Sequence, residues 1–220
     1  MASQPYNYSG GAGIGLTTAI SPTRFATYSQ SAKNHQDALR LYTWNTAVSA
    51  AFYGPLQALE IALRNAVHSA MSVGHDQNWL QTGQVLRQSE QHTVKMTTRR
   101  LSKAKKQINP DSVVSELTFG FWVALFANVY DTSIWRTDLF RVFLPRIKNR
   151  SHIHDVLDRL RTLRNRIAHH EPIFQRNLQH DYDRIRQIVV AVNRPTLNWL
   201  DYHSRVPNAL AQKPHAVRYF

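Results

Sequence analysis

The sequence predicts an all-α fold, and three observations lead to that prediction. Apolar residues recur with helical spacing in several stretches, and no stretch alternates apolar and polar side chains for long enough to form a convincing strand. Glycine, proline and asparagine residues separate the helical stretches. We therefore expect a bundle of about six to eight helices.

The expected helices follow one another along the chain. Their approximate ranges are 36–52, 55–73, 89–106, 135–143, 151–169, 181–192 and 195–202. Gly54 and Pro55 are expected to separate the first two helices, because proline suits the first turn of a new helix. Residues 74–83 are expected to form a loop.

A second group of signals lies in the middle of the chain. The turn at Asn109 and Pro110 is followed by Asp111 or Ser112 as the expected helix cap. The apolar stretch 115–130 then contains a central glycine, at which two short helices are expected to meet.

Domain organisation follows from length and composition. The chain has 220 residues, which is enough to bury a sizeable core. The first 20 residues are rich in Ser, Gly and Tyr and carry no charged side chain. We expect residues 1–20 to be a flexible arm and residues 21–220 to be one helical domain.

The charge balance indicates the kind of partner. There are 27 Lys plus Arg against 14 Asp plus Glu, a formal net charge of +13. Such an excess attracts polyanions, either nucleic acid or an acidic membrane surface, although a basic surface can also serve solubility alone. The chain has no cysteine, which excludes disulfides, thiolate metal sites and a cysteine nucleophile. No apolar run reaches the ~18 residues of a membrane helix and no signal peptide is evident, so a cytoplasmic protein without membrane contact is expected.

The helix expected to be capped by Ser151 carries a charge on its apolar face. Its apolar stripe consists of Ile153, Val156, Leu157, Leu160, Leu163 and Ile167. Arg164 falls within that stripe, so it requires a partner or a polar cleft. On the helix from Pro55, Glu60 lies just beside the apolar stripe. We hypothesise that Glu60 contacts Arg164, and the alternative is an i, i+4 pair between Glu60 and Arg64 on the surface.

Polar residues with catalytic potential follow Arg164. Asn165, His169, His170 and Glu171 come next, and a proline after Glu171 should end the helix around the histidines. A helix C-terminus favours protonated imidazole. Arg164 and His169 lie about 140° apart on an ideal helix. They converge only if the arginine reaches round, if the helix end unwinds, or if a second subunit completes the site.

This set of side chains suits RNA cleavage. Histidine transfers protons near neutral pH, and arginine binds phosphate oxygens with fixed geometry. RNA supplies its own nucleophile, the 2′-OH, so a base and a cation are sufficient to cleave it without a metal. The spacing alone is weak evidence, because a histidine at a helix end is more often a cap than a catalyst.

The residues 163–174, LRNRIAHHEPIF, resemble the signature of Abi-like proteins, bacterial abortive-infection proteins placed in the HEPN superfamily. Further blocks resemble the same family in the expected order. They are SPTRFATYSQSA, ALRLYTWNTAVSAAF, LQALEIALRNAVHSAM, VSELTFGFWVALF and LNWLDYHSRVPNAL, and together with the signature they cover about 21–210.

The resemblance implies a HEPN-like helical bundle and a particular site. The superfamily hallmark is an arginine, four to six residues, then a histidine, often with a polar residue after the arginine. Arg164, Asn165 and His169 fit it, and His170 offers a second fit. Many members are metal-independent endoribonucleases that dimerise. The resemblance thus implies a homodimer, RNA as substrate, no cofactor, and a role in phage defence or a toxin–antitoxin system with a possible antitoxin protein.

Other residues are candidates for supporting roles. Arg64, followed by an asparagine and then His68, falls one residue short of the hallmark and is expected to pack near the site. Asn45 is expected to be a buried polar group that meets this region, or to make only a local hydrogen bond. Phe119 and Trp122 are expected to fill the core rather than to stack on bases.

A basic cluster is a candidate phosphate track. It consists of Arg99, Arg100, Lys103, Lys105 and Lys106. A solvated helix face explains the same residues equally well.

Two alternatives to an enzyme remain. One is a non-catalytic RNA-binding or protein-binding bundle in which Arg164 and His169 are structural. The other, a metal site at His152 and His154, is weaker, because a helix would splay these residues and no carboxylate–histidine set has suitable spacing.

Overall fold

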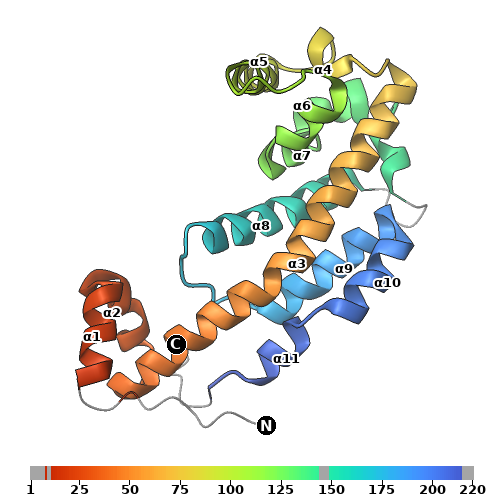
Figure 1. Cartoon of the computed structure of the whole chain (residues 1–220). Helices are drawn as coiled ribbons and strands as arrows, with labels where there is room; N and C mark the ends of the chain where they lie inside the picture. The colour runs from red at the N-terminus through yellow and green to blue at the C-terminus, as the bar shows by residue number, and fades with distance from the viewer. Residues whose placement is uncertain (1–7, 9–10, 144–148, 215–220) are drawn as a thin grey trace. The chain divides into compact units, whose positions relative to one another are not determined.

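The computed structural model describes Tyr8 and residues 11–143 and 149–214 (Figure 1). These residues form helices joined by turns and loops, and no strand occurs among them, which confirms the all-α prediction. They divide into two compact units. Unit 1 comprises Met1–Tyr53, Arg166–His180 and Ser204–Phe220, and unit 2 comprises Gly54–Asn165 and Asp181–His203.

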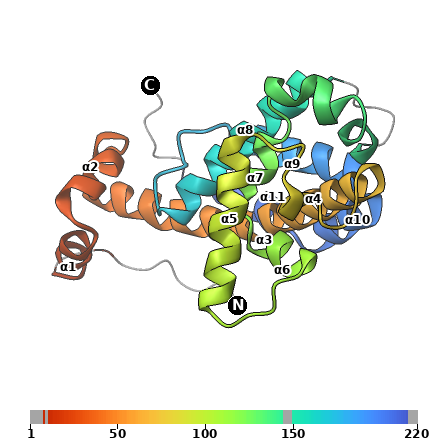
Figure 2. The same ribbon diagram turned by 90° about the horizontal axis from the view of Figure 1, so that it is seen from above.

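Unit 1 begins with two short helices, α1 (Gly11–Ile20) and α2 (Pro22–Gln30), which pack against each other (Figures 1 and 2). Ser21 caps α2, since its hydroxyl accepts a hydrogen bond from the backbone N–H of Arg24. The flexible arm predicted over 1–20 thus includes a helix at 11–20. Residues 1–7 and 9–10 lie outside the described part of the chain, and the flexibility of the arm stays a prediction.

The long helix α3 (His35–Gly74) corrects one prediction. Gly54 and Pro55 do not separate two helices, because α3 runs through them without interruption. An interior proline removes one backbone hydrogen bond and costs about 3 kcal/mol. Buried apolar side chains on both sides of this point, Phe52 before it and Leu56 after it, keep the helix continuous. The boundary between the two units nevertheless falls at this dipeptide, between Tyr53 and Gly54.

Unit 2 contains most of the remaining helices. They are α4 (Trp79–Thr82), α5 (Gln88–Lys103), α6 (Pro110–Glu116), α7 (Phe119–Ala124), the short helices η1 (Asn128–Tyr130), η2 (Asp131–Trp135) and η3 (Leu139–Val142), and α10 (Arg194–His203). Two further helices begin in one unit and end in the other by residue number: α8 (Arg150–Ala168) and α9 (Leu178–Val192). The last helix, α11 (Val206–Ala211), belongs to unit 1. Within unit 2, α5 lies against α4 and α6 (Figure 2).

The starts of α6 and α8 differ from the predictions, because an asparagine supplies the cap at each. Asn109, not Asp111 or Ser112, caps α6 in a capping box. Asn149, not Ser151, accepts from the backbone N–H of His152 at the start of α8. The loop expected at 74–83 contains α4, and the break between α6 and α7 falls at 117–118 rather than at the glycine. With such short segments the chain has more helices than expected.

The core agrees with the predictions for aromatic residues. Phe119 and Trp122 are buried, so they fill the core of unit 2 as expected. Within the described residues, no helix combines the length and apolar character needed to cross a membrane.

Candidate functional site

The part of α8 up to Asn165 anchors the candidate site in unit 2. Five of the six residues in its predicted apolar stripe are buried, with Ile153, Leu160 and Leu163 wholly inaccessible, while Ile167 is half-buried. The side chain of Arg164 is 41% exposed, so it lies at the edge of that stripe instead of in the core. Its Nε atom is 3.9 Å from Oε2 of Glu60 on α3, whose side chain is 20% exposed. The predicted contact between Glu60 and Arg164 is therefore confirmed.

Glu60 occupies a mixed environment. Burial raises the pKa of its carboxyl group, while Arg164, then Arg64, and a hydrogen bond from the backbone N–H of Phe119 act in the opposite direction. Phe119 is the first residue of α7, and Thr118 before it makes no side-chain cap. Glu60 thus accepts one of the backbone donors that a helix start leaves unpaired. The alternative, a surface pair between Glu60 and Arg64, is only partly correct. Arg64 acts on Glu60 electrostatically, but the ion pair within 4 Å is with Arg164.

Arg64 itself is directed to a third element. Its Nη1 atom donates to the backbone oxygen of Ser115 on α6, at 3.3 Å. Its Nε atom is buried and has no hydrogen-bond partner among the described residues. One turn further along α3, Nδ1 of His68 accepts a hydrogen bond from the indole N–H of Trp79 at 3.0 Å, and burial lowers the pKa of His68. His68 therefore acts as a neutral acceptor there.

The end of α8, in unit 1, has an unusual backbone. The N–H of His170 bonds to the oxygen of Ile167 and the N–H of Glu171 bonds to the oxygen of Arg166. This pair of bonds is a Schellman motif, which requires a left-handed residue that is normally glycine. His170 fills that position with φ 56°. The helix therefore ends at the histidines, as the following proline predicted, and it ends on a side chain that pays a conformational cost for being there.

The side chains around this turn are accessible. His169, His170 and Glu171 are all exposed. Glu171 Oε2 lies 3.9 Å from Nε of Arg166, and the backbone hydrogen bond from Glu171 to Arg166 joins the same two residues. Two imidazoles thus project from a helix end whose backbone is closed by two hydrogen bonds.

Asn45 holds the segment that follows the motif. Its side chain is 5% exposed, and its Oδ1 accepts from the backbone N–H of Ile173 at 2.8 Å and of Phe174 at 3.1 Å. It is also hydrogen-bonded to Tyr28, a buried phenol whose pKa burial raises to about 12. The prediction that Asn45 is a buried polar group meeting this region is confirmed for the segment after the histidines.

The candidate residues thus form two groups. In unit 2, the carboxylate of Glu60 interacts with both Arg64 and Arg164. Asn165, which follows Arg164 on α8, is half-buried and is the last residue of α8 that belongs to unit 2. In unit 1, the second group consists of Arg166, His169, His170, Glu171 and, through the next segment, Asn45. The boundary between the units falls directly after Asn165, within α8.

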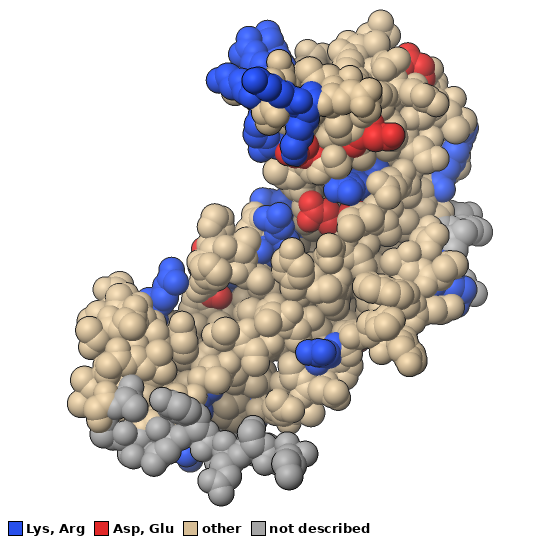
Figure 3. Space-filling model, in the orientation of Figure 1, with Lys and Arg blue, Asp and Glu red and all other residues tan. Residues whose placement is uncertain are grey.

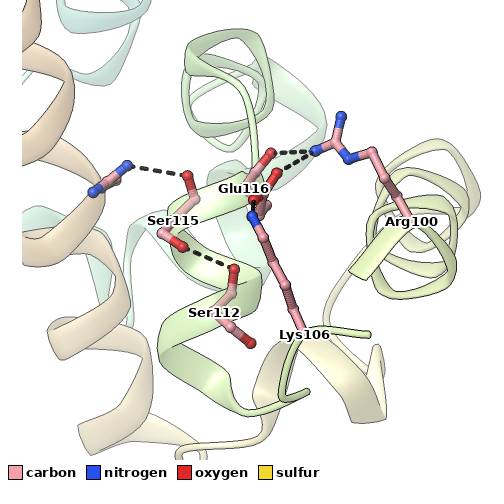
Figure 4. Close-up of polar contacts among 6 residues, drawn as sticks. Arg100, Lys106, Ser112, Ser115 and Glu116 are labelled. Atoms are coloured by element: carbon pink, nitrogen blue, oxygen red, sulfur yellow. Dashed lines mark hydrogen bonds and ion pairs between the residues drawn. The ribbon is translucent and has the colours of Figure 1, made fainter. Parts of the chain in front are cut away.

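The basic cluster lies at the C-terminal end of α5, where blue side chains gather in Figure 3. Two of its five members are not free. Arg100 donates to Oε2 and to the backbone oxygen of Glu116, both at 3.0 Å, and Lys106 donates to Oε1 of Glu116 at 2.8 Å (Figure 4). These contacts, that with Lys106 first, lower the pKa of the Glu116 carboxyl group. A single acid, which the sequence did not single out, thus offsets part of the cluster's positive charge.

The other members of the cluster face solvent. Arg99, Lys103 and Lys105 are exposed, and the guanidinium of Arg99 contacts the sulfur of Met96 at 3.9 Å. Lys105 has φ 53° and closes α5 with a second Schellman motif. Both candidate functional segments therefore end a helix on a non-glycine left-handed residue.

The metal alternative receives no support from the residues that the structure describes, since nowhere among them do three or more His, Asp or Glu side chains gather in a metal-binding group. His154 lies 3.9 Å from the carboxylate of Asp155, its neighbour in the chain.

Comparison with known proteins gives one match. The model of the family described as "Abi-like protein" matches residues 17–175, which include the motif on α8 and every resembling block except the closing one, 197–210. Searches of curated proteins and of solved structures found no match. Because the family match spans more than two thirds of the sequence, this chain belongs to the Abi-like protein family.

Proposed function

We propose that this protein is a metal-independent endoribonuclease of the HEPN type, acting as a toxin or phage-defence effector. Membership of the Abi-like family supports a role in abortive infection. The observation that supports the enzymatic part is the strained end of α8, where His169 and the left-handed His170 are exposed and follow Arg164 and Asn165 in the chain. Backbone strain of this kind is concentrated at functional sites.

The proposed chemistry needs two proton transfers and one cation. His169, as the neutral imidazole, takes the proton of the RNA 2′-OH, and the oxygen attacks the adjacent phosphorus. The bond from phosphorus to the 5′ oxygen breaks, and that oxygen takes a proton from a protonated imidazole, for which His170 is the candidate. Arg164 offsets the charge on the phosphate, and Asn165 orients these groups. The products are a 2′,3′-cyclic phosphate and a 5′-OH.

Glu60 has a positioning role in this proposal. Arg164 is 41% exposed and would otherwise sample many rotamers, whereas an ion pair with the less exposed Glu60 limits them. Asn45 has a similar role for the backbone beyond the histidines.

A homodimer belongs to the same proposal, because Arg164 and His169 point about 140° apart on a regular helix. A composite site that takes the arginine from one subunit and the histidine from the other removes this conflict. An antitoxin protein that covers the exposed histidines is the partner we propose for the resting state.

The first test uses purified protein, RNA and excess EDTA. Wild type should cleave, and Arg164→Ala and His169→Ala should each lose cleavage while keeping the wild-type melting temperature. Equal cleavage by both variants would point to a contaminant or to another site. Salt-sensitive RNA binding without cleavage would replace the enzyme by a non-catalytic RNA-binding bundle.

Mixing the two inactive variants tests the composite site. If the arginine and histidine come from different subunits, a mixed dimer contains one intact site. Random exchange then restores about a quarter of wild-type activity, because about half of the dimers are mixed and each has one of two sites intact. If one subunit supplies both groups, the mixture stays inactive.

A further inference from the structure

The further inference concerns a pocket in unit 2, formed by α3, α10 and the connection before α10. Its volume is about 720 Å³. Its lining includes the apolar residues Ala62 and Trp199 and the side-chain amides of Gln57, Asn65 and Asn193. None of the residues that line it is charged. Small and apolar side chains and three side-chain amides therefore define its chemistry.

Trp199 is the unusual residue in this pocket. The chain has five tryptophans, and Trp44, Trp79, Trp122 and Trp135 are at most 6% exposed. Trp199 is 53% exposed. His203, one turn further along α10, lies against its ring with 5.2 Å between the ring centres, which restricts the indole. An exposed, restrained indole at a pocket is the arrangement that stacks on a flat aromatic ligand.

The amides supply hydrogen bonds around the apolar surface. Asn193 already uses its Oδ1 to accept from the N–H and the hydroxyl of Thr196, so it can offer a ligand its amino group as a donor. Gln57 and Asn65 are exposed and carry both a donor and an acceptor. Nucleobases combine flat faces with edges that carry donors and acceptors, and both features match this lining.

A second pocket adjoins the first and contains a cationic side chain, that of Arg64. Asn65 lines both pockets, and Arg64, its neighbour in the chain, lines the second one. Arg64 and Asn65 both come from α3, whereas the acid in the second pocket, Asp111, comes from α6. Arg64 is half-buried at this second pocket, so its guanidinium can meet a phosphate next to a bound base.

We propose that the pocket formed by α3 and α10 binds a nucleobase of single-stranded RNA, stacked on Trp199, with the adjacent phosphate directed to Arg64. This proposal rests on RNA being the substrate and names the subsite that holds it. The net charge of +13 favours a polyanion over an uncharged apolar partner at this surface. Three amides around the pocket also favour a base over an apolar helix.

The test measures binding of a short unstructured oligonucleotide with 2′-O-methyl groups, which cannot be cleaved through the 2′-OH. Binding should quench the tryptophan emission, and Trp199→Phe should abolish most of the quenching while retaining affinity. Trp199→Ala should weaken binding roughly 5- to 100-fold, the range for loss of one stacked base. Ala62→Leu, which fills the pocket, should weaken it as well.

Two controls sharpen the result. Phe140→Ala removes an aromatic ring that is 46% exposed on η3 and does not line the pocket, and it should leave affinity unchanged. An abasic oligonucleotide of equal length keeps the phosphates but lacks bases, so it should bind wild type no better than the intact strand binds Trp199→Ala.

Several outcomes would overturn the base pocket. They are equal affinity of Trp199→Ala and wild type, equal affinity for the abasic strand, or an absence of binding. If Trp199→Ala binds RNA normally but changes a dimer to a monomer, the surface is an interface between copies. Cleavage is scored separately: RNA cleavage that is unaffected in Trp199→Ala leaves the ribonuclease standing without this subsite. Trp199-dependent binding without cleavage leaves the subsite standing without the ribonuclease.

Discussion

Oε2 of Glu60 lies 3.9 Å from Nε of Arg164, so an acid near the middle of α3 meets the arginine of the motif on α8. The same carboxylate accepts from the N-terminus of α7 and is acted on by Arg64. One partly buried acid therefore links three elements of unit 2. Its replacement should affect both the pH dependence of stability and the positioning of Arg164.

The first prediction concerns Glu60→Gln. Burial raises the pKa of Glu60 above its ordinary value of 4.5, so the folded protein holds this proton more tightly than the unfolded chain. Its contribution to the free energy of unfolding should fall as the pH rises from 4.5 through the folded pKa. Urea unfolding of wild type and Glu60→Gln from about pH 4 to about pH 7 measures this contribution as the difference between their free energies of unfolding. A difference that grows in favour of wild type with rising pH would mean that Arg164 outweighs burial.

The second prediction concerns Asn45→Ala. This change leaves the backbone N–H groups of Ile173 and Phe174 without their buried acceptor. We expect a loss of about 2–3 kcal/mol in the free energy of unfolding. The matched control is Thr46→Ala on the same helix, whose hydroxyl is exposed and bonds only to the preceding turn. Equal effects of the two substitutions would contradict the role assigned to Asn45.

The third prediction concerns the left-handed turn. His170→Gly should be more stable to unfolding than His170→Ala by about 1 kcal/mol, because both lose the imidazole but only glycine adopts this backbone freely. The same comparison at Lys105, which has φ 53° at the end of α5, should give a gain of the same sign. Thermal melts measure both differences. Identical melting temperatures for the glycine and alanine variants would mean that the left-handed turn is not adopted in solution.

The fourth prediction concerns Glu116→Gln. Removing this carboxylate releases Arg100 and Lys106, which now point at it. If the basic cluster binds RNA phosphates, affinity should rise several-fold at low salt, and the dependence of affinity on salt should steepen. The control is Asp158→Asn, which makes the same change in net charge at a pair with Arg161 on α8. An equal gain in the control would assign the effect to overall charge.

The sequence was most informative where helical periodicity and one charge coincide. Arg164 and Glu60 could be paired in advance, because each was an ionisable group on or beside an apolar face. The continuity of α3 through Pro55 could not be predicted, since it depends on tertiary packing that outweighs the cost of the proline.

Other features depended on backbone geometry or on distant partners. His170 occupies the left-handed position that glycine normally fills at a helix end. Without a glycine there, the sequence did not predict a left-handed residue. Glu116 is separated from Arg100 by a loop and lies on another helix, and only the fold brings the two together. Trp199 is half exposed beside a pocket, and no local pattern in the sequence distinguishes that position from a core position.

The most direct measurement identifies the ends of the RNA fragments that the wild-type protein produces in EDTA. Our account predicts a 2′,3′-cyclic phosphate on one fragment and a 5′-OH on the other, and no cleavage where the reacting nucleotide lacks its 2′-OH. Uncut RNA, cleavage at a 2′-deoxy position, or fragments with a 3′-OH and a 5′-phosphate would contradict it.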